Sequence, residues 1–347
     1  MTTKILFKKW TAAAAAAAIL AGGVLPTGAA SLSSQSAFAA EADSFAYLQS
    51  EVRVQLTELI LSNEQAENAL QLPYGADEHF NLYKISREAA IQVFDPSVSD
   101  TKLRETYRKF VKEYDSYLAF RFSEGAAGQV RQVYRSIESI HRSQSEPFSP
   151  ETQAYLDFLD RALEVFKNPQ SGTPLIVDTF KTYMSYGVEQ DRAKPQDAAL
   201  QQESLRVIAN REISLNQTMA ASSAKPEDYA AQLQRHREIT ARVQAIIGDP
   251  STTYNVRSAA YLSYFPSFNT MEMSLLLAED LVAARTLMES PAGIRSGQYP
   301  ASAFGDLRVA INKATYALQN EQLEIPIKRA NYDLNGAIRT FRGRLVP

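Results

Sequence analysis

Cysteine is absent from the 347-residue chain, and this absence excludes disulfide bonds and any reaction that needs a thiolate. Stability must therefore come from side-chain packing. Tryptophan occurs once, as Trp10. Because sugar-binding surfaces often stack rings on tryptophan, its scarcity argues against such a surface built on indole rings. Seventeen tyrosines remain, and their rings could stack on sugars instead.

Motifs for metal, nucleophile and phosphate chemistry are also missing. The histidines, His79, His141 and His236, are isolated in sequence, and no HExxH, EF-hand, Gly-x-Ser-x-Gly, P-loop or Gly-x-Gly-x-x-Gly pattern occurs. We therefore expect no metal and no cofactor, and we expect His236 on a solvated helix face. Glu279-Asp280 is the carboxylate pair to inspect for hydrolase chemistry, although such a pair is more typical of an amphipathic helix's polar side.

The N-terminus has the pattern of a secretion signal. Lys4, Lys8 and Lys9 precede an apolar run over 11–25, and Ala37-Phe38-Ala39 is a small-x-small cleavage site. The alternative, a transmembrane anchor, is weaker because the run is short and is broken by glycine and proline. The sequence predicts a signal peptide over 1–39, Gram-positive-type export and no integral membrane segment after its removal.

The charge of the exported chain excludes one class of partner. Removing three lysines with the signal from 36 basic residues leaves 33, against 39 acidic ones. This negative balance argues against nucleic acid as the main partner.

Residues 293–341 contain two apolar series with helical spacing, separated by a polar stretch that holds a proline. Each series steps by 4, 3 and 4, which places its members on one stripe of an α-helix. The first series is Leu307, Ile311, Ala314 and Leu318, and the second is Ala330, Leu334, Ala337 and Phe341. The pattern predicts two helices that fold back on each other as a hairpin.

A second copy of this hairpin is expected over 125–166. Its first stripe is Val133, Ile137 and Ile140, and its second is Leu156, Leu159, Leu163 and Phe166. Upstream matches support a tandem duplication. Asp95-Pro96-Ser97 matches Asp249-Pro250-Ser251 at an offset of 154, and Arg87-Glu88 matches Arg237-Glu238 at 150. Tyr107, Phe110 and Tyr114 match Tyr261, Tyr264 and Phe268, again at 154.

The fold class that follows is all-α, with two related helical-bundle units in tandem and mostly antiparallel helices. We expect unit 1 over 40–168, a linker or bridging helix over 169–195 and unit 2 over 196–347, because breakers concentrate at 168–174. Helices are expected over 45–69, 81–94, 102–122, 175–188, 196–219, 227–247, 252–268, 271–288, 301–318 and 327–342.

The C-terminal hairpin also resembles a known kind of module. The residues that carry the resemblance are Gly297-Gln298-Tyr299-Pro300, Ala303, Leu307, Ala310-Ile311, Ala314, Ala330, Leu334, Ala337 and Phe341. They look like the small found-in-various-architectures helical modules of secreted bacterial proteins, which accompany polysaccharide lyases and cell-surface proteins. The resemblance implies an extracellular spacer, adhesion or sugar-associated role and brings no catalytic residue.

The candidate binding residues are basic and aromatic. Arg339, Arg342 and Arg344 end the chain, and Tyr107 and Tyr114 belong to an aromatic stripe that is otherwise explained by core packing. The arginines would suit an anionic polysaccharide or a cell-wall polymer. A second basic cluster holds Arg104, Arg108, Lys109 and Lys112.

The sequence therefore favours a secreted, non-enzymatic protein for extracellular binding or spacing. The alternatives are a carbohydrate-active or other hydrolase with its site between the units, and a toxin or inhibitor that acts on a protein or a membrane. A tyrosine and arginine surface would favour the binding protein, convergent carboxylates would favour the enzyme, and a long concealed apolar hairpin would favour the toxin.

Overall fold

The computed structural model describes residues 45–70, 80–123, 150–191 and 198–347, together with 135, 138 and 139. Within these residues the regular structure is helical, and the exception is one isolated bridge between Ala292 and Tyr299. The all-α prediction is confirmed. None of the described helices combines the length and the apolar character that crossing a membrane requires. The predicted signal peptide and the first helix of the 125–166 hairpin lie outside the described residues.

Contacts divide the chain into two compact units, of which the first contains the described residues up to 82 and from 107 to 191. Its helices are η1 (Ala46–Gln49), α2 (Glu51–Ala69), most of α4 (Asp100–Ser123), α6 (Pro150–Lys167) and α7 (Thr173–Asp191). α7 packs against α2 and α6. Phe122 of α4 meets Phe180 of α7 edge to face, with ring centroids 5.2 Å apart. The predicted stripe of α6 is confirmed, because Leu156, Leu159, Leu163 and Phe166 are buried.

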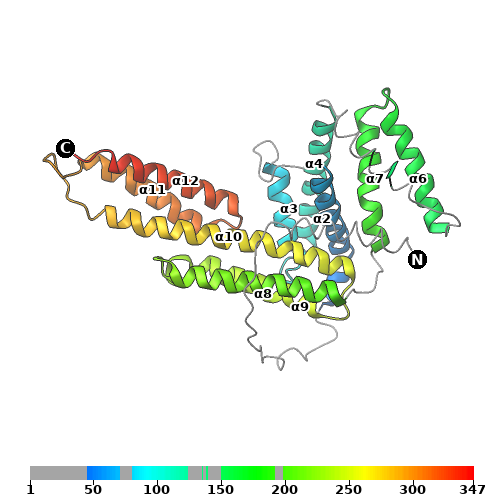
Figure 1. The fold of residues 1–347 in the computed structure, drawn as a ribbon, viewed down its shortest axis with the longest axis horizontal. Coiled ribbons are helices and arrows are strands. Elements are labelled where there is room, and N and C mark those ends of the chain that lie inside the picture. The colour runs from blue at the N-terminus through cyan, green and yellow to red at the C-terminus, as the bar shows by residue number, and fades with distance from the viewer. Residues whose placement is uncertain (1–44, 71–79, 124–134, 136–137, 140–149, 192–197) are drawn as a thin grey trace. The chain divides into compact units, whose positions relative to one another are not determined.

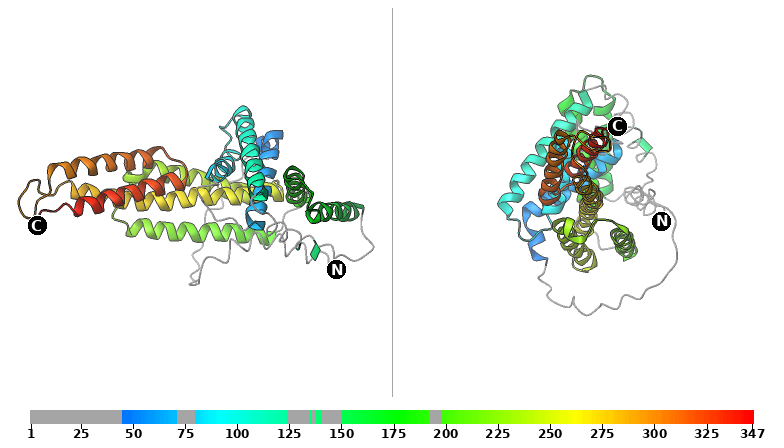
Figure 2. Two further views of the ribbon diagram at one scale, coloured as in Figure 1. Left: turned by 90° about the horizontal axis from the view of Figure 1, so that it is seen from above. Right: turned by 90° about the vertical axis from the view of Figure 1, so that its left-hand side faces the viewer.

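The second unit contains residues 83–106 and the described residues from 198 onward. Its helices are α3 (Phe80–Gln92), α8 (Ala198–Ala221), η3 (Pro226–Tyr229), α9 (Ala230–Gly248), α10 (Tyr254–Leu287), α11 (Ala301–Asn320) and α12 (Glu324–Arg342). α10 packs against α8, α9, α11 and α12. Figure 1 shows α11 and α12 side by side along α10, and Figure 2 shows the same neighbours from two other directions.

α10 corrects the expectation of two helices over 252–268 and 271–288. It is one helix of 34 residues that runs through Pro266. The Thr270 hydroxyl donates to the Pro266 carbonyl at 2.6 Å, and the buried face continues on both sides with Phe268, Met271 and Leu275. A proline inside a helix removes one hydrogen bond, and burial of the flanking turns offsets that loss here.

The α11–α12 hairpin has a shorter connection than the sequence suggests. α12 begins at Glu324, so Pro326 lies in its first turn, where a backbone N–H has no helical partner to lose. Gln232 of α9 donates from Nε2 to the carbonyls of Leu318 and Glu321, at 2.9 and 2.7 Å. These bonds satisfy carbonyls that the end of α11 leaves open.

The division into units differs from the boundaries expected from the sequence. α7 falls in the range expected to be a linker, yet it belongs to the first unit, because Phe180, Tyr183 and Met184 are buried there. Residues 83–106 group with the C-terminal part. Tyr83 of α3 donates to Glu324 of α12 at 2.6 Å, and Asp95 lies 3.7 Å from Arg242 of α9.

The two Asp-Pro-Ser segments form the same local turn. Oδ1 of Asp95 accepts from the Ser97 amide at 2.9 Å, and Oδ1 of Asp249 accepts from the Ser251 amide at 2.6 Å. Each turn leads from one helix into the N-terminus of the next, namely from α3 into α4 and from α9 into α10.

The N-caps that follow these turns also correspond. Ser99 Oγ accepts from the Lys102 amide at 3.3 Å, and Thr253 Oγ1 accepts from the Val256 amide at 3.4 Å. Several positions 154 residues apart in α3 and α9 are buried alike. The offset of 150 that Arg87-Glu88 indicates does not describe this pairing. The pairs buried in both segments include Ser86 and Thr240, Ala89 and Val243, Val93 and Ile247, Phe110 and Tyr264, and Tyr114 and Phe268. The duplication stays a prediction, which these shared features support.

Phe341 packs the end of α12 against the start of α11. Its ring stacks on Tyr299 at 4.2 Å between centroids and meets Phe304 edge to face at 5.1 Å, and only 1% of Phe341 is exposed. We expect Phe341→Ala to lower the free energy of unfolding by about 3–5 kcal/mol, because it removes a buried ring and leaves a cavity. Urea denaturation followed by circular dichroism measures this change.

The matched control for Phe341→Ala is Tyr316→Ala on the same hairpin, because Tyr316 is 64% exposed. We expect the control to change the stability by less than about 0.5 kcal/mol. Equal effects of the two substitutions would contradict the role of Phe341 as a core anchor.

Candidate functional site

The outer face of α12 carries a row of basic and aromatic side chains. We call Lys328, Tyr332, Arg339 and Arg342 the basic stripe. Their spacing of 4, 7 and 3 places them along one side of the helix, beside the buried row of Ile327, Leu334, Ile338 and Phe341. All four are exposed, and Tyr332 is exposed to 70%. The stripe extends over about 21 Å, since a helix rises 1.5 Å per residue.

Charge on the stripe is not neutralised locally. Among the described residues, no carboxylate forms an ion pair with Lys328, Arg339 or Arg342. Residues 301–347 hold seven basic and four acidic side chains, in a chain whose net charge is −3. The hairpin is therefore a positive region of an acidic protein.

The structure separates the three arginines that the sequence grouped. Arg339 and Arg342 belong to the stripe, whereas Arg344 pairs with Asp306 of α11 at 2.8 Å. Sequence analysis missed Lys328 and Tyr332. The signal that could have found them is their position in the helical repeat, since both fall outside the apolar series of α12.

A polar clamp fixes the rotation of α12. Asp280 of α10 accepts hydrogen bonds from the side-chain amides of Asn331 and Asn335, at 2.7 and 2.6 Å. Two bonds from successive turns of α12 hold that helix on α10 and limit its rotation. Glu279-Asp280 is the carboxylate pair that the sequence offered for hydrolase chemistry, and these contacts give Asp280 a structural role. The Asp280 carboxylate already has two donors, and Glu279 makes no hydrogen bond to either asparagine.

Tyr107 and Tyr114 do not form a binding surface on α4. Tyr114 is only 2% exposed, and its hydroxyl has no hydrogen-bond partner among the described residues. Burial raises the pKa of this phenol above its ordinary value. Tyr107, about two turns earlier on the helix, is half-buried. Core packing therefore explains Tyr114, whose ring has almost no exposed surface to offer a ligand.

Exposed tyrosines lie elsewhere, on the α11–α12 hairpin. Tyr316 of α11 is 64% exposed and Tyr332 of α12 is 70% exposed. Tyrosine offers a flat apolar ring and a hydroxyl, so it suits amphipathic partners such as sugar rings. The α11–α12 hairpin thus exposes tyrosines together with basic side chains. These tyrosines are not the ones predicted from the sequence.

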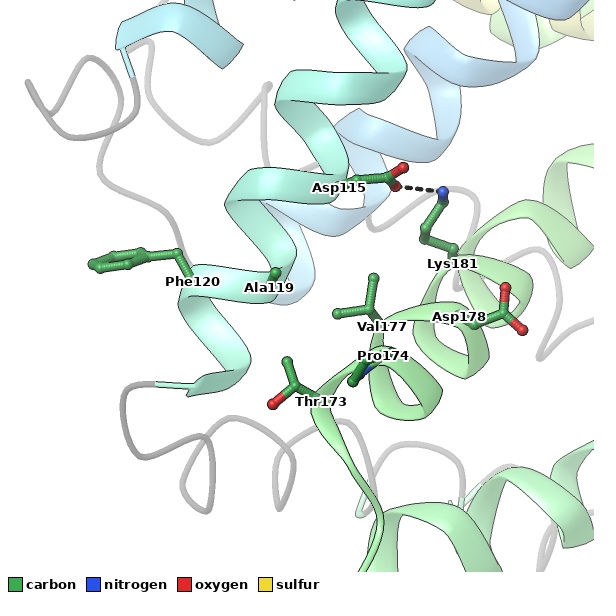
Figure 3. Close-up of a pocket in the computed structure, with 8 residues that line it drawn as sticks. All are labelled: Asp115, Ala119, Phe120, Thr173, Pro174, Val177, Asp178 and Lys181. Carbon is green, nitrogen blue, oxygen red and sulfur yellow. Dashed lines mark hydrogen bonds and ion pairs between the residues drawn. The ribbon is translucent and has the colours of Figure 1, made fainter.

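A groove in the first unit is a second candidate, and Figure 3 shows its lining. It lies between α4 and α7 and has a volume of about 650 Å³, within the range of small-molecule sites. Lys181 and Asp115 form an ion pair at 2.5 Å, and Val177 and Pro174 supply apolar wall. The two charges neutralise each other, and Asp178 and Thr173 are the other polar side chains of the lining.

A buried polar network in the second unit centres on His236, which corrects the expectation of a solvated histidine. His236 is 2% exposed. Its Nδ1 lies 2.9 Å from Ser267 Oγ and its Nε2 lies 2.9 Å from Glu212 Oε1. Tyr264 donates to the same Glu212 oxygen at 2.8 Å. These residues come from α8, α9 and α10, and no sequence spacing indicated that they would meet.

Glu212 is held in its ionised form by these partners. Burial by itself raises the pKa of the Glu212 carboxyl, but hydrogen bonds from His236 and Tyr264 and the charges of His236 and Arg237 outweigh it and hold the pKa below its ordinary value. With the Glu212 carboxylate as acceptor, Nε2 of His236 donates, and Nδ1 lies within hydrogen-bond distance of the Ser267 hydroxyl.

Ser267, His236 and Glu212 have the residue types of a catalytic triad. Their surroundings, however, indicate a role in holding the helices together. Ser267 is 5% exposed, so a substrate has no access to its hydroxyl. Catalysis at a serine also needs N–H donors directed at the oxyanion. The amides around Ser267 belong to the interior of α10, where the helix uses them.

Comparison with known proteins finds no family model that matches the chain, and neither a curated protein nor a solved structure is significantly similar to it.

A substitution of Glu212 tests the His236 network. We expect Glu212→Gln to lower the free energy of unfolding by about 1 kcal/mol at pH 7, because a neutral acceptor replaces a charged one. A lowered folded-state pKa contributes stability above the unfolded-state value, and this contribution is lost as the pH falls through the folded-state value. The difference between variant and wild type should therefore close in acid. Chemical denaturation between pH 7 and pH 3 measures it.

The control for Glu212→Gln is Glu238→Gln, which removes an exposed carboxylate from α9. We expect its stability to follow the wild type within about 0.5 kcal/mol at every pH. A difference for Glu212→Gln that grew as the pH fell would contradict the assigned direction of the pKa.

Proposed function

We propose that this protein is a secreted, non-enzymatic binding or spacer protein whose α11–α12 hairpin holds an anionic polysaccharide or cell-wall polymer. The observation that carries the proposal is the basic stripe, whose three exposed cations have no carboxylate partner in the part of the chain that the structure describes and are interleaved with an exposed tyrosine. Guanidinium groups donate two parallel hydrogen bonds to carboxylate or phosphate, and a ring between them provides a stacking surface.

The shape of the stripe supports a polymer rather than a small ligand. Its members are spread along about 21 Å of one helix, so a chain with repeated negative charges can contact several of them at once. A convex helix face encloses no small molecule. Tyr316 of the neighbouring helix is also exposed and adds a second ring to the same hairpin.

The proposed binding has a direct test. The double substitution Arg339→Ala with Arg342→Ala should weaken binding to alginate, a polymer of carboxylates, by about tenfold or more, because it removes the two guanidinium groups. Wild-type binding should fall as sodium chloride rises from about 50 to 500 mM, since salt screens exposed charges. Neutral dextran should bind weakly at every salt concentration. Affinity electrophoresis measures all three.

A matched control removes the same charge from another exposed basic cluster. Arg104 and Arg108 are exposed on α4. Arg104→Ala with Arg108→Ala should leave alginate binding close to that of the wild type, and Arg344→Ala should weaken it less than Arg339→Ala, because Asp306 already neutralises Arg344. Equal losses from both double variants would mean that net charge, rather than the stripe, controls binding.

The location outside the cell has its own test. N-terminal sequencing of the protein from culture supernatant should begin at or near Ala40, since signal peptidase cleaves after a small-x-small motif. Lys4→Asp with Lys8→Asp and Lys9→Asp should reduce export, because it reverses the charge of the n-region. Supernatant protein that begins at Met1 would refute the cleavage, and protein found in the cytosol alone would refute the export.

A further inference from the structure

The loop between α10 and α11 is held in a defined conformation around residue 294. The Gly293 amide donates to the Tyr299 carbonyl and the Tyr299 amide donates to the Pro291 carbonyl, both at 2.9 Å. On the other side, the Arg295 amide donates to the side-chain carbonyl of Gln298 at 3.0 Å. The backbone on both sides of residue 294 is therefore fixed.

The last residues of the chain brace this loop. The Val346 amide donates to the Gln298 carbonyl, and the Gly297 amide donates to the Val346 carbonyl, both at 2.9 Å. Gly297 has a φ of 78°, a left-handed conformation that glycine adopts without strain. Tyr299 anchors the base of the loop by stacking on Phe341. Figures 1 and 2 both show the C-terminus beside this loop, at one end of the α10–α12 bundle.

The braced loop presents aliphatic side chains to solvent. Ile294 is 88% exposed, more than any other large hydrophobic residue in the described part of the chain, and Leu345 is 45% exposed. An isolated exposed aliphatic residue is ordinary on a protein surface. Here, however, two of them lie on segments that are hydrogen-bonded to each other, and the nearly complete exposure of Ile294 means that its side chain protrudes.

A positive charge adjoins the more exposed of these aliphatic side chains. Arg295 follows Ile294 directly and is exposed, with no carboxylate partner among the described residues. Arg344 precedes Leu345 but pairs with Asp306, and Glu289 is the acidic side chain of the loop. A protruding aliphatic group next to an arginine suits a bilayer surface, where hydrocarbon lies beneath a plane of anionic headgroups. A protein partner would need a matching pocket.

We propose that Ile294, Arg295 and Leu345, the lipid tip, attach the protein peripherally to an anionic lipid bilayer. Ile294 and Leu345 enter the interface, and Arg295 contacts lipid phosphate. The tip uses residues outside the basic stripe, so this inference does not rest on the proposed polymer binding. Its failure and the failure of polymer binding are separately measurable.

The first experiment is co-sedimentation with lipid vesicles. The wild type should bind vesicles of phosphatidylglycerol and phosphatidylcholine more than vesicles of phosphatidylcholine alone. Ile294→Ser should reduce the bound fraction several-fold, and Arg295→Ala should reduce it on the anionic vesicles. Ile213→Ser is the matched control, because Ile213 is 57% exposed on α8. Equal binding by the two isoleucine variants overturns the proposal, as does wild-type protein that stays in the supernatant.

The second experiment uses the scarcity of tryptophan. In a Trp10→Phe background, Ile294→Trp provides the single tryptophan of the chain. Its emission should shift to the blue on addition of anionic vesicles, and lipids brominated in the acyl chain should quench it. A blue shift that depends on protein concentration without vesicles would assign the tip to self-association instead and overturn the proposal. Ile294→Ser should leave alginate binding unchanged.

Discussion

Burial of α10 is the constraint on which the second unit depends. This helix of 34 residues packs against α8, α9, α11 and α12, so its side chains are buried on several faces. Without disulfides, these contacts are the main source of stability. Two of the serines that α10 buries bond to carbonyls of the same helix. Ser274 donates to the Thr270 carbonyl at 2.7 Å, and Ser263 donates to the Ala260 carbonyl at 2.7 Å.

Polar clamps then fix how the surrounding helices pack on α10. Asp280 accepts hydrogen bonds from Asn331 and Asn335, and this contact holds α12 on α10. A half-buried carboxylate between two amide donors tolerates less rotation than an apolar contact, because displacing either amide leaves charge unsatisfied. The His236 network ties α8, α9 and α10 by the same principle.

The hairpin and the lipid tip offer two different surfaces on one element. The stripe is extended, basic and interrupted by a tyrosine, which suits a polymer with repeated charges. The tip is small, aliphatic and braced by the C-terminal residues, which suits a soft apolar layer. Both depend on Phe341 and Tyr299, because their stacked rings join the end of α12 to the start of α11. A protein with both surfaces would hold a polymer near a membrane, in accordance with a spacer role.

Helix positions and the apolar stripes followed from the sequence, because both depend on local spacing. Leu307, Leu318, Leu334 and Phe341 are buried as their periodicity predicts. The continuity of α10 through Pro266, the packing of α7, and the fates of His236 and Tyr114 did not follow. Each depends on what a distant helix presents to that residue, and spacing within one segment carries no information about a partner elsewhere in the chain. His236 is buried because Glu212 and Ser267 meet it, 24 and 31 residues away. Arg339 and Arg342 are exposed because Leu334 and Phe341 occupy the side of α12 that packs into the bundle.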